Sequence, residues 1–399
     1  MSRLWDSGVP LDQRVLAFTA GEDHALDDRL IAYDVRASIA HAEMLAEARL
    51  LSEQDLRLIC AGLAEISASH ARGEWRVPLE QEDGQTALEI RLTERIGPAG
   101  ARIHLGRSRN DQVLAALRLY LRDVVADLAP ATEAVAEALE AIAARQGEVA
   151  LPGYTHMQPA MPSTVDGWAR GYAAEIHDDA EGVRQTLRRI NRNPLGSAAG
   201  YGTPNLPISR EATREKLAFA EVQEPVTAVQ LSRGKAESHL LFELTLLMQD
   251  LGRLAADLLL FYTREFAYVE LPAGITTGSS SMPQKRNPDI FELIRGRSAT
   301  ALACLVEALS VYSRLPSGYN RDLQLIKAPL FRGIDVCSMV LAVLPAVLGG
   351  VRFRPENIRL DPSIHAAARA NELVVREGIP FRDAYRRVAA EIAREIGEQ

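Results

Sequence analysis

The stretch from Ala273 to Asp289, AGITTGSSSMPQKRNPD, combines residue types that could close over an anion. Three consecutive serines follow Gly278, and glycine allows backbone angles that other residues adopt with difficulty. Lys285 adds a cation, and no acidic residue occurs between Leu271 and Asn287. A mobile, hydroxyl-rich loop with a nearby ammonium can hold a carboxylate and close over it. A flexible surface turn is the alternative interpretation and the more common case for a loop rich in glycine and serine, although the lack of acids counts against it.

Three other polar stretches interrupt the expected helices. Each falls at a predicted helix end, where free backbone N–H groups attract anions. In HLGRSRNDQ, from His104 to Gln112, Arg107 and Arg109 flank Ser108. An arginine recognises a carboxylate or a phosphate at two points at once. Asp111 could instead cap the next helix, so an anion site and a solvated turn both remain open for this stretch.

The next stretch, PGYTHMQPAMP from Pro152 to Pro162, places Thr155 and His156 in a predicted loop. A loop histidine can act as an acid or a base near neutral pH, although a plain surface histidine is the more common case. The eight histidines show no HxxxH or HxxEH spacing, and the three cysteines lie far apart. The sequence therefore predicts neither a metal site nor a disulfide framework.

The last stretch, YNRDLQLIK from Tyr319 to Lys327, could supply a hydroxyl, an amide and an ammonium. Gln324 and Lys327 are three positions apart, so they share one face of a helix. An ordinary amphipathic helix start is the alternative interpretation.

Composition narrows the class of protein. The 399 residues are 47% hydrophobic and 25% charged, which is typical of a globular chain. The formal charge of −8 and the lack of a basic stripe argue against a nucleic-acid-binding protein. No Walker loop, GxGxxG fingerprint or GxSxG elbow occurs. That argues against nucleotide hydrolysis, dinucleotide chemistry and an α/β-hydrolase.

We expect no targeting or membrane segment. Met1 to Gly8 is polar and lacks the apolar core of a secretory signal. The apolar runs Ala301–Leu305 and Val340–Leu348 are too short to span a bilayer. These features predict a cytoplasmic protein.

Long helices must position the four stretches. Apolar residues recur at helical spacing from Val113 to Leu128 and, in alternating steps of four and three, from Leu240 to Leu258. The second pattern has the 3.5-residue period of helices that pack nearly parallel in a bundle. Strand patterns are nearly absent, so we predict an all-α fold. Stretches without proline predict long helices at about 163–193, 226–271, 289–315 and 330–344.

Helices of this length need partners along their whole length, which favours oligomerisation. We expect three regions: an N-terminal helical domain over 1–105, a central helical-bundle domain over 106–350, and a short C-terminal helical domain over 351–399. The segment VRFRPENIRLDP, from Val351 to Pro362, is typical of a linker into the last region.

Taken together, the four stretches resemble the fumarase/aspartase superfamily. GSSSMPQKRNPD is similar to the superfamily signature GSSxMPxKxN. Five further strings resemble the argininosuccinate lyase branch of this superfamily. They are HLGRSRNDQ, the preceding EIRLTERIG, PGYTHMQPAMP, YNRDLQ and NPLGSAAGYG (Asn193–Gly202). The likeness runs in order from about residue 30 to residue 385.

This resemblance implies a mainly helical, three-domain fold and a homotetramer whose long helices form a common twenty-helix bundle. It also implies active sites shared between three subunits, and no cofactor. The implied reaction is the reversible elimination of fumarate from argininosuccinate, which gives arginine in the last step of arginine biosynthesis. The proton removed lies beside a carboxylate, so a dianionic intermediate forms and needs preorganised positive charge.

The functional positions of the family carry over to this sequence one by one. By resemblance, Ser279 is the catalytic base, and backbone N–H groups of its loop and Lys285 could stabilise its alkoxide. His156 matches the active-site histidine and Glu292 its charge partner. Lys285 and Asn287 would bind the succinyl carboxylates. Ser108, Arg109, Asn110 and Thr155 match succinate-binding positions, and Tyr319, Gln324 and Lys327 match positions that bind the substrate's carboxylate and arginine portions.

The sequence departs from the branch in two motifs. Glu82–Glu89 reads EDGQTALE, with Gln85 where the family often has histidine. LQLIK has Leu325 and Ile326 where the family often has glutamate and aspartate. Both changes bear on substrate affinity. The chain also lacks the usual LWGGRF string and ends early for the family, so we expect a reduced C-terminal domain.

Two alternatives stand beside this interpretation. The first is a sister lyase that acts on adenylosuccinate, aspartate or malate. The GRSRNDQ string and Gln284 in MPQKRN favour argininosuccinate instead. The second is a non-catalytic, crystallin-like relative, which is disfavoured because every proposed catalytic position holds a competent residue.

Overall fold

The computed structural model describes residues 12–397, so the segment Met1–Gly8 lies outside the described residues. The chain divides into two compact units. Unit 1 comprises the residues up to Ala129 together with Glu181–Thr245 and Thr300–Cys337. Unit 2 comprises Pro130–Ala180, Leu246–Ala299 and the residues from Ser338 onward. The three-region division with boundaries near 105 and 350 stays a prediction.

The N-terminal part of unit 1 consists of short helices around an apolar core. Leu45, Leu63 and Leu88 are among the buried residues of this core, and Trp75 closes it with an indole N–H donated to the carbonyl of Ile66. The helices are α1 (Gln13–Ala20), α2 (Asp23–Asp27), η1 (Asp28–Leu30), α3 (Ile31–Glu47), α4 (Glu53–Ala71), η2 (Leu79–Gln81), α5 (Gly84–Ile96), α6 (Pro98–Ala101) and η3 (Arg102–His104).

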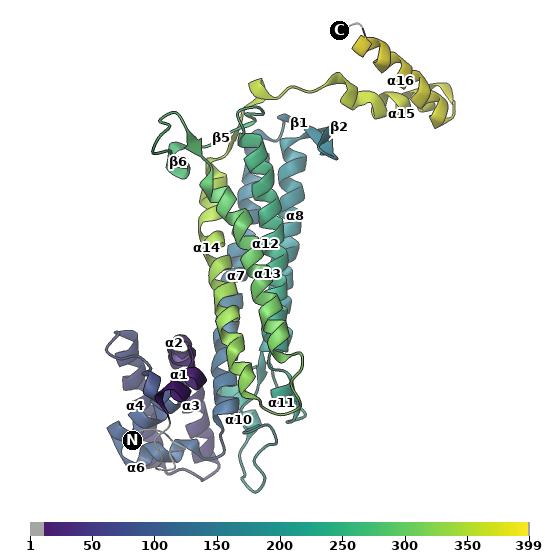
Figure 1. Ribbon diagram of the computed structural model, residues 1–399. Coiled ribbons are helices and arrows are strands. Elements are labelled where there is room, and N and C mark those ends of the chain that lie inside the picture. The colour runs from purple at the N-terminus through teal and green to yellow at the C-terminus, as the bar shows by residue number, and fades with distance from the viewer. Residues whose placement is uncertain (1–11, 398–399) are drawn as a thin grey trace. The chain divides into compact units, whose positions relative to one another are not determined.

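Five long helices follow, and Figure 1 labels each of them. They are α7 (Arg109–Gln146), α8 (Val165–Gln185), α12 (Lys235–Tyr262), α13 (Asp289–Tyr312) and α14 (Lys327–Gly350). The predicted seam is confirmed, because Leu240, Leu244, Leu247, Leu251, Leu254 and Leu258 are all buried. The expected all-α fold is likewise confirmed by the predominance of helix.

Proline does not end these helices as the sequence suggested. Pro130 lies inside α7, and Pro345 lies inside α14. A proline within a helix removes one backbone hydrogen bond and costs about 3 kcal/mol. Val135 beyond the first proline and Leu344 beside the second are buried, so apolar packing along both helices offsets that cost.

Helix packing within unit 1 is close. An added Cβ at Gly333 of α14 would lie 2.5 Å from the end of the Leu241 side chain of α12, so a larger residue there would have to displace that side chain. Tyr120 of α7 packs edge-on against Phe331 of α14, with ring centroids 5.3 Å apart. These contacts hold the start of α14 against α7 and α12.

In unit 2, the Trp168 indole of α8 donates a hydrogen bond to Asp257 of α12 at 3.0 Å. Its ring packs against Phe261 of α12 and Phe353. A Cβ at Gly252 of α12 would be in contact with Ser298 of α13. Unit 2 is therefore a helix bundle with an aromatic cluster at one end.

Short strands connect the helices in four two-stranded sheets. They are β1 (Ala150–Thr155) with β2 (Gln158–Thr164), β3 (Arg192–Asn193) with β4 (Glu221–Val222), β5 (Val269–Glu270) with β8 (Arg352–Phe353), and β6 (Thr277–Gly278) with β7 (Arg286–Asn287). All pair antiparallel except β3 with β4. The hairpin of β1 and β2 was expected to be a loop, because its three prolines and one glycine hide any strand pattern.

The remaining elements are α9 (Leu187–Ile190), α10 (Arg210–Lys216), α11 (Ala228–Leu231), η4 (Ala273–Ile275), η5 (Arg321–Ile326), η6 (Pro355–Asn357), η7 (Pro362–His365), α15 (Ala366–Glu377) and α16 (Phe381–Gly397). The predicted linker Val351–Pro362 is only partly one. Its first residues form β8, and Val351 and Phe353 are buried.

One segment contradicts the expectation that no apolar stretch is long enough to cross a membrane. Arg321–Gly350 has 30 residues and a mean hydropathy of 1.9, which suffices by length and composition. Half of its most apolar window is buried inside the protein, as in the core helix of a bundle. Pro345 hides this segment in the sequence, because a proline within an apolar run suggests that a helix ends there.

Candidate active site

The serine-rich stretch forms a hairpin rather than an open loop. Thr277 pairs with Asn287 and Gly278 with Arg286, so β6 and β7 bring its two ends together. The strands end at Asn287, and α13 begins two residues later at Asp289. The predicted start of a helix after Asn287-Pro288 is therefore confirmed. Residues 279–285 are the loop of this hairpin, which we call the serine loop.

Ser279 is the first residue of the serine loop, and its side-chain oxygen accepts two backbone hydrogen bonds. The N–H of Ser281 is 3.3 Å away and that of Met282 is 3.1 Å away. Two N–H groups aimed at one oxygen stabilise negative charge on it. The local backbone therefore suits a serine that has to carry an alkoxide, as the sequence analysis expected.

A cavity of about 930 Å³ lies beside the serine loop. Lys285, Asn287 and Glu292 all line it, so the structure brings three of the predicted residues together. The Asn287 amide also donates to the Gly278 carbonyl at 3.4 Å, which ties the two strands. Five basic and three acidic residues line the cavity, so its net charge is positive and suits a dicarboxylate.

His156 lies at the tip of the hairpin of β1 and β2, in the same unit as the serine loop. His156 has φ 53° and Met157 has φ 59°, so both adopt the left-handed backbone that a two-residue type I′ turn requires. Glycine or asparagine is the usual residue in such turns. Thr155, the last residue of β1, pairs with Gln158. Among the described residues, no hydrogen bond or ion pair joins His156 to Glu292.

In unit 1, Ser108 starts α7 with reciprocal capping. Its hydroxyl accepts from the Asn110 N–H at 3.3 Å, and Asp111 accepts from the Ser108 N–H at 3.0 Å. The other oxygen of Asp111 accepts from the N–H groups of Gly196 and Ala198. Asp111 is therefore the helix cap that we considered, and it also fastens the glycine-rich loop that follows β3. Burial raises the pKa of Asp111 to about 6.

The two arginines beside Ser108 play different parts. Arg109 donates to Asp83 at 2.7 Å and keeps a partly exposed guanidinium. Arg107 is buried and donates to Ser38 at 2.8 Å. It lies close enough to Asp34 for the two charges to interact, although burial is the larger influence and lowers its pKa. Only Arg109 is therefore placed to meet a ligand.

Lys327, the first residue of α14, is almost fully enclosed. Its ammonium lies 2.5 Å from Asp27 and 3.0 Å from Asp23, and only 1% of the residue is exposed. Asp27 also accepts the backbone N–H of Gly84 at 2.9 Å, so one carboxylate joins α2, α5 and α14. Burial raises the pKa of Asp23 to about 6, although the charge of Lys327 opposes that shift.

Tyr319 and Gln324 precede this lysine in the chain. The guanidinium of Arg233 lies 5.3 Å from the centroid of the Tyr319 ring. The side-chain oxygen of Gln324 is buried and has no hydrogen-bond partner among residues 12–397. A buried, unpaired amide oxygen costs free energy unless a ligand or water satisfies it, so Gln324 is a good candidate for a ligand contact.

The residues that depart from the family pattern are also explained. Gln85 is buried, and its amide donates to Asp34 at 3.1 Å. Gln112 donates to the other oxygen of Asp34 at 2.8 Å. Ile326 is buried, whereas Leu325 is 64% exposed. Gln85 is thus part of a buried amide–carboxylate network in unit 1.

The twelve predicted site residues fall into two sets of six. The set in unit 1 is Ser108, Arg109, Asn110, Tyr319, Gln324 and Lys327. The set in unit 2 is Thr155, His156, Ser279, Lys285, Asn287 and Glu292. Each unit therefore carries six of the predicted residues.

Sequence reasoning missed the acids that hold the basic residues of the site. Asp23 and Asp27 lie on α2, 300 positions or more from Lys327, and Asp83 lies before α5. One signal in the sequence could have pointed to them. The chain has only four lysines, and Lys327 stands at the start of an apolar helix, where a buried ammonium needs an acid as its partner.

Comparison with known proteins agrees with the geometry. A family model described as "Lyase" matches residues 8–302. Among solved structures, an EDDS lyase variant with bound fumarate is 25% identical, with a TM-score of 0.82 over 96% of this chain and 76% of that one. A fumarate lyase:delta crystallin from Brucella melitensis bound to cobalt is 19% identical and has the same fold, with a TM-score of 0.81 over 98% and 93% of the chains. The fold and the serine loop thus define a lyase of the fumarase/aspartase superfamily.

Curated relatives narrow the branch. An argininosuccinate lyase from Sorangium cellulosum (strain So ce56) is 46% identical over 393 residues, which is 98% of this chain and 91% of the relative. The argininosuccinate lyases from Xylella fastidiosa (strain Temecula1 / ATCC 700964) and Xanthomonas campestris pv. campestris (strain B100) are 43% and 42% identical to this chain. Each match spans 97% of this chain, and the two matches span 87% and 90% of the respective relatives. The chain belongs to the argininosuccinate lyase family.

Proposed function

We propose that this chain cleaves argininosuccinate reversibly into fumarate and arginine, the last step of arginine biosynthesis. The observation that carries the proposal is Ser279, whose oxygen accepts two backbone N–H groups beside a cavity lined by Lys285 and Asn287. The reaction needs no cofactor, because the serine and the surrounding positive charge supply the chemistry. We place the enzyme in the cytoplasm, where the sequence analysis expects it.

In the proposed elimination, the alkoxide of Ser279 removes a proton from the carbon next to a succinyl carboxylate. The electron pair moves into that carboxylate and forms a dianion, which Lys285 and the Asn287 amide stabilise. Collapse of the dianion breaks the C–N bond, and the departing guanidine nitrogen receives a proton. We assign His156 and Glu292 to the handling of that proton, directly or through water.

The unit 1 residues bind the substrate in this proposal. Ser108, at the start of α7, presents the positive end of a long helix to a carboxylate. Arg109 adds a guanidinium, and Gln324 an unpaired amide oxygen. Asp23 and Asp27 carry one more negative charge than Lys327 neutralises, which favours a cationic part of the substrate nearby. In this proposal, Asp23 and Asp27 replace the two acids that the family often has at the positions of Leu325 and Ile326.

We further propose a homotetramer in which each active site takes residues from three subunits. The support is the division of the site residues between two units, together with large apolar side chains that α12, α13 and α14 leave exposed. They include Phe242, Leu246, Leu293, Leu302, Val306, Leu309, Met339 and Val343. Apolar faces of this extent are typical of an interface between copies.

Fumarate release tests the function. The purified protein is given argininosuccinate, adenylosuccinate, aspartate and malate in turn, and fumarate is followed by its ultraviolet absorbance. We expect turnover with argininosuccinate alone. Turnover of adenylosuccinate without argininosuccinate would identify a sister lyase, and no turnover by an intact oligomer would support the crystallin-like alternative.

A further inference from the structure

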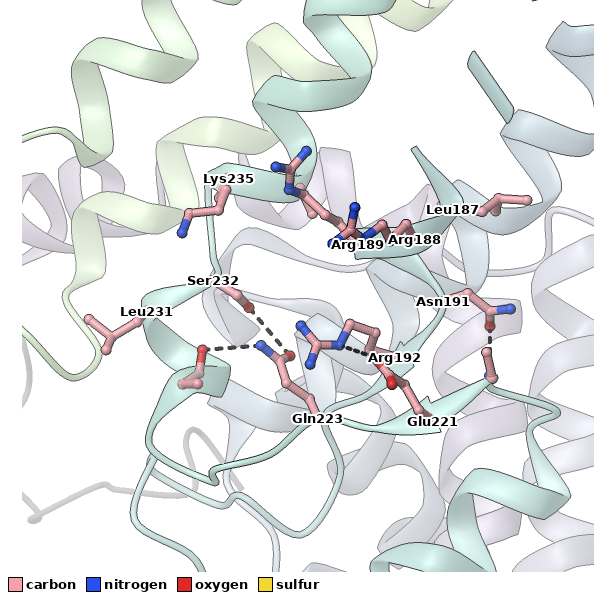
Figure 2. A pocket seen from close by; sticks show the side chains of 13 residues that line it. Leu187, Arg188, Arg189, Asn191, Arg192, Glu221, Gln223, Leu231, Ser232 and Lys235 are labelled. Atoms are coloured by element: carbon pink, nitrogen blue, oxygen red, sulfur yellow. Dashed lines mark hydrogen bonds and ion pairs between the residues drawn. The ribbon is translucent and has the colours of Figure 1, made fainter. Parts of the chain in front are cut away.

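Unit 1 contains a second cavity, of about 970 Å³, that none of the predicted site residues lines. Figure 2 shows its walls, which come from α9 and the residues after it, β4, α11 and the first turn of α12. The cavity is separate from the one beside the serine loop, and the lyase chemistry proposed above does not use it.

Basic residues dominate its lining. Arg188, Arg189 and Lys235 are exposed, and none of the three forms an ion pair within the part of the chain that the structure describes. We call them the cation triad. Arg192 is neutralised by Glu221, the single acidic residue of the lining, at 2.6 Å. The triad therefore leaves three positive charges unbalanced on a chain whose formal charge is −8.

A buried arginine behind the cavity adds to this positive charge. Arg118 donates to the Arg192 carbonyl at 2.6 Å and to the Ser232 hydroxyl at 2.8 Å, and both of these residues line the cavity. Burial lowers the pKa of Arg118 to about 10; Glu237 opposes the shift, and Arg192 is among the neighbours that deepen it.

The opposite wall offers different contacts. Lys235 and Ala236 belong to the first turn of α12, which carries the positive end of the helix dipole, and the Lys235 N–H donates to the Ser232 carbonyl at 3.1 Å. Leu231 is 56% exposed beside them, and Ala228 lies on the same short helix. Gln223 is fixed, because its amide donates to the Ala228 carbonyl at 3.1 Å. One side thus carries the two arginines, and the other side combines the ammonium of Lys235 with the apolar side chain of Leu231.

We propose that this cavity binds an organic phosphate with at least two negative charges. Its phosphate groups lie at the cation triad and its apolar part lies against Leu231. Arginine matches phosphate oxygens at two points, lysine provides a point charge, and the start of a helix adds the positive end of its dipole. A cavity of about 970 Å³ suits a small molecule better than a nucleic acid, which needs an extended basic stripe.

Calorimetric titration of the full-length protein tests the proposal with three probes in magnesium-free buffer: ATP, inorganic triphosphate and adenosine. We expect saturable binding of ATP, weaker binding of triphosphate and none of adenosine. R188A/R189A is expected to weaken ATP binding about tenfold or more. Leu231→Ala is expected to weaken ATP but not triphosphate.

Arg57→Ala is the matched control, because Arg57 is an exposed arginine of α4 in the same unit that does not line the cavity. It should bind ATP as the wild type does, and circular dichroism should show that every variant is folded. The proposal is overturned if the wild type binds neither phosphate compound, or if R188A/R189A binds ATP unchanged. Equal affinities for ATP and triphosphate would show that Leu231 does not contact the ligand, which overturns that part of the proposal. A change of oligomeric state in R188A/R189A without ATP binding by the wild type shows that another copy covers the cavity.

Discussion

The ammonium of Lys327 lies 2.5 Å from a carboxylate oxygen of Asp27, and both side chains are buried. The pair joins the start of α14 to α2, and Asp23 adds a second carboxylate at 3.0 Å. A buried lysine that loses a partner keeps its desolvation cost without the compensating attraction. The pair therefore matters for the stability of unit 1 as well as for the candidate site.

Asp27→Asn should lower the free energy of unfolding by about 3 kcal/mol. The change preserves the size of the side chain but leaves Lys327 with a single carboxylate. Urea unfolding followed by circular dichroism measures the loss. Asp322→Asn, at an exposed acid of η5, is the control and should change little. A loss below about 1 kcal/mol for Asp27→Asn would mean that water or another group screens the ammonium.

Ser279→Ala should retain substrate binding yet reduce kcat by about 10³-fold or more, because it removes the proposed base. The change also removes the oxygen that accepts the Ser281 and Met282 N–H groups, so substrate binding is measured beside kcat to show that the loop still binds the substrate. Ser280→Ala changes the neighbouring exposed serine and should retain most of the activity. Near-normal turnover by Ser279→Ala would show that another group is the base.

Lys285→Arg should reduce kcat/KM severely although it conserves the charge. A planar guanidinium cannot take the place of a compact ammonium inside a loop that closes over a carboxylate. Lys216→Arg is the matched control, because Lys216 pairs with Glu43 and Glu47 away from both cavities and should tolerate the change. Steady-state kinetics on both variants decide the point, and normal constants for Lys285→Arg would refute the role.

The sequence predicted the features that depend on local pattern. The 3.5-residue period marked the buried seam of α12, and the spacing of glycine, serine and proline marked the serine loop. Features that depend on distant packing were missed. Pro130 lies inside α7 because its neighbours are buried, and Lys327 pairs with a carboxylate 300 positions earlier. No local pattern announces such a partner.

The strained turn at His156 shows a different limit. Residues with φ above zero in a type I′ turn are usually glycine or asparagine, so His156 and Met157 gave no hairpin signal. The pairing of Thr155 with Gln158 closes the turn around them, and such backbone geometry is common at functional sites. The roles of the twelve site residues came from resemblance to a family, because their spacing alone left an ordinary turn equally open in most cases.

Subunit mixing tests whether the active sites are shared. If one site takes Ser279 and His156 from different subunits, mixed oligomers of Ser279→Ala and His156→Ala should recover activity that neither variant has alone. Subunit exchange is verified first by native mass spectrometry. Ser279→Ala mixed with Lys285→Met is the control and should recover none, because both residues lie on one serine loop. Equal failure of both mixtures after proven exchange would count against shared sites.

His41 should make the folded protein sensitive to acid. Its Nε2 lies 2.8 Å from the Leu105 carbonyl and donates to it, and burial lowers the pKa of the imidazole to about 3. Below pH 6.5 the unfolded chain binds a proton that the folded chain refuses, so stability falls as the pH falls. Between pH 6.5 and 5, His41 should lower the free energy of unfolding by about 1.5 kcal/mol.

The test compares variants because Asp34 has the opposite effect on the wild type. Burial raises the pKa of Asp34 to about 6, so its contribution to the free energy of unfolding rises as the pH falls over this range. The gap in unfolding free energy between the wild type and His41→Gln should change by that amount over this range, whereas exposed His365→Gln should follow the wild type. A gap independent of pH would show that His41 is protonated in the folded state.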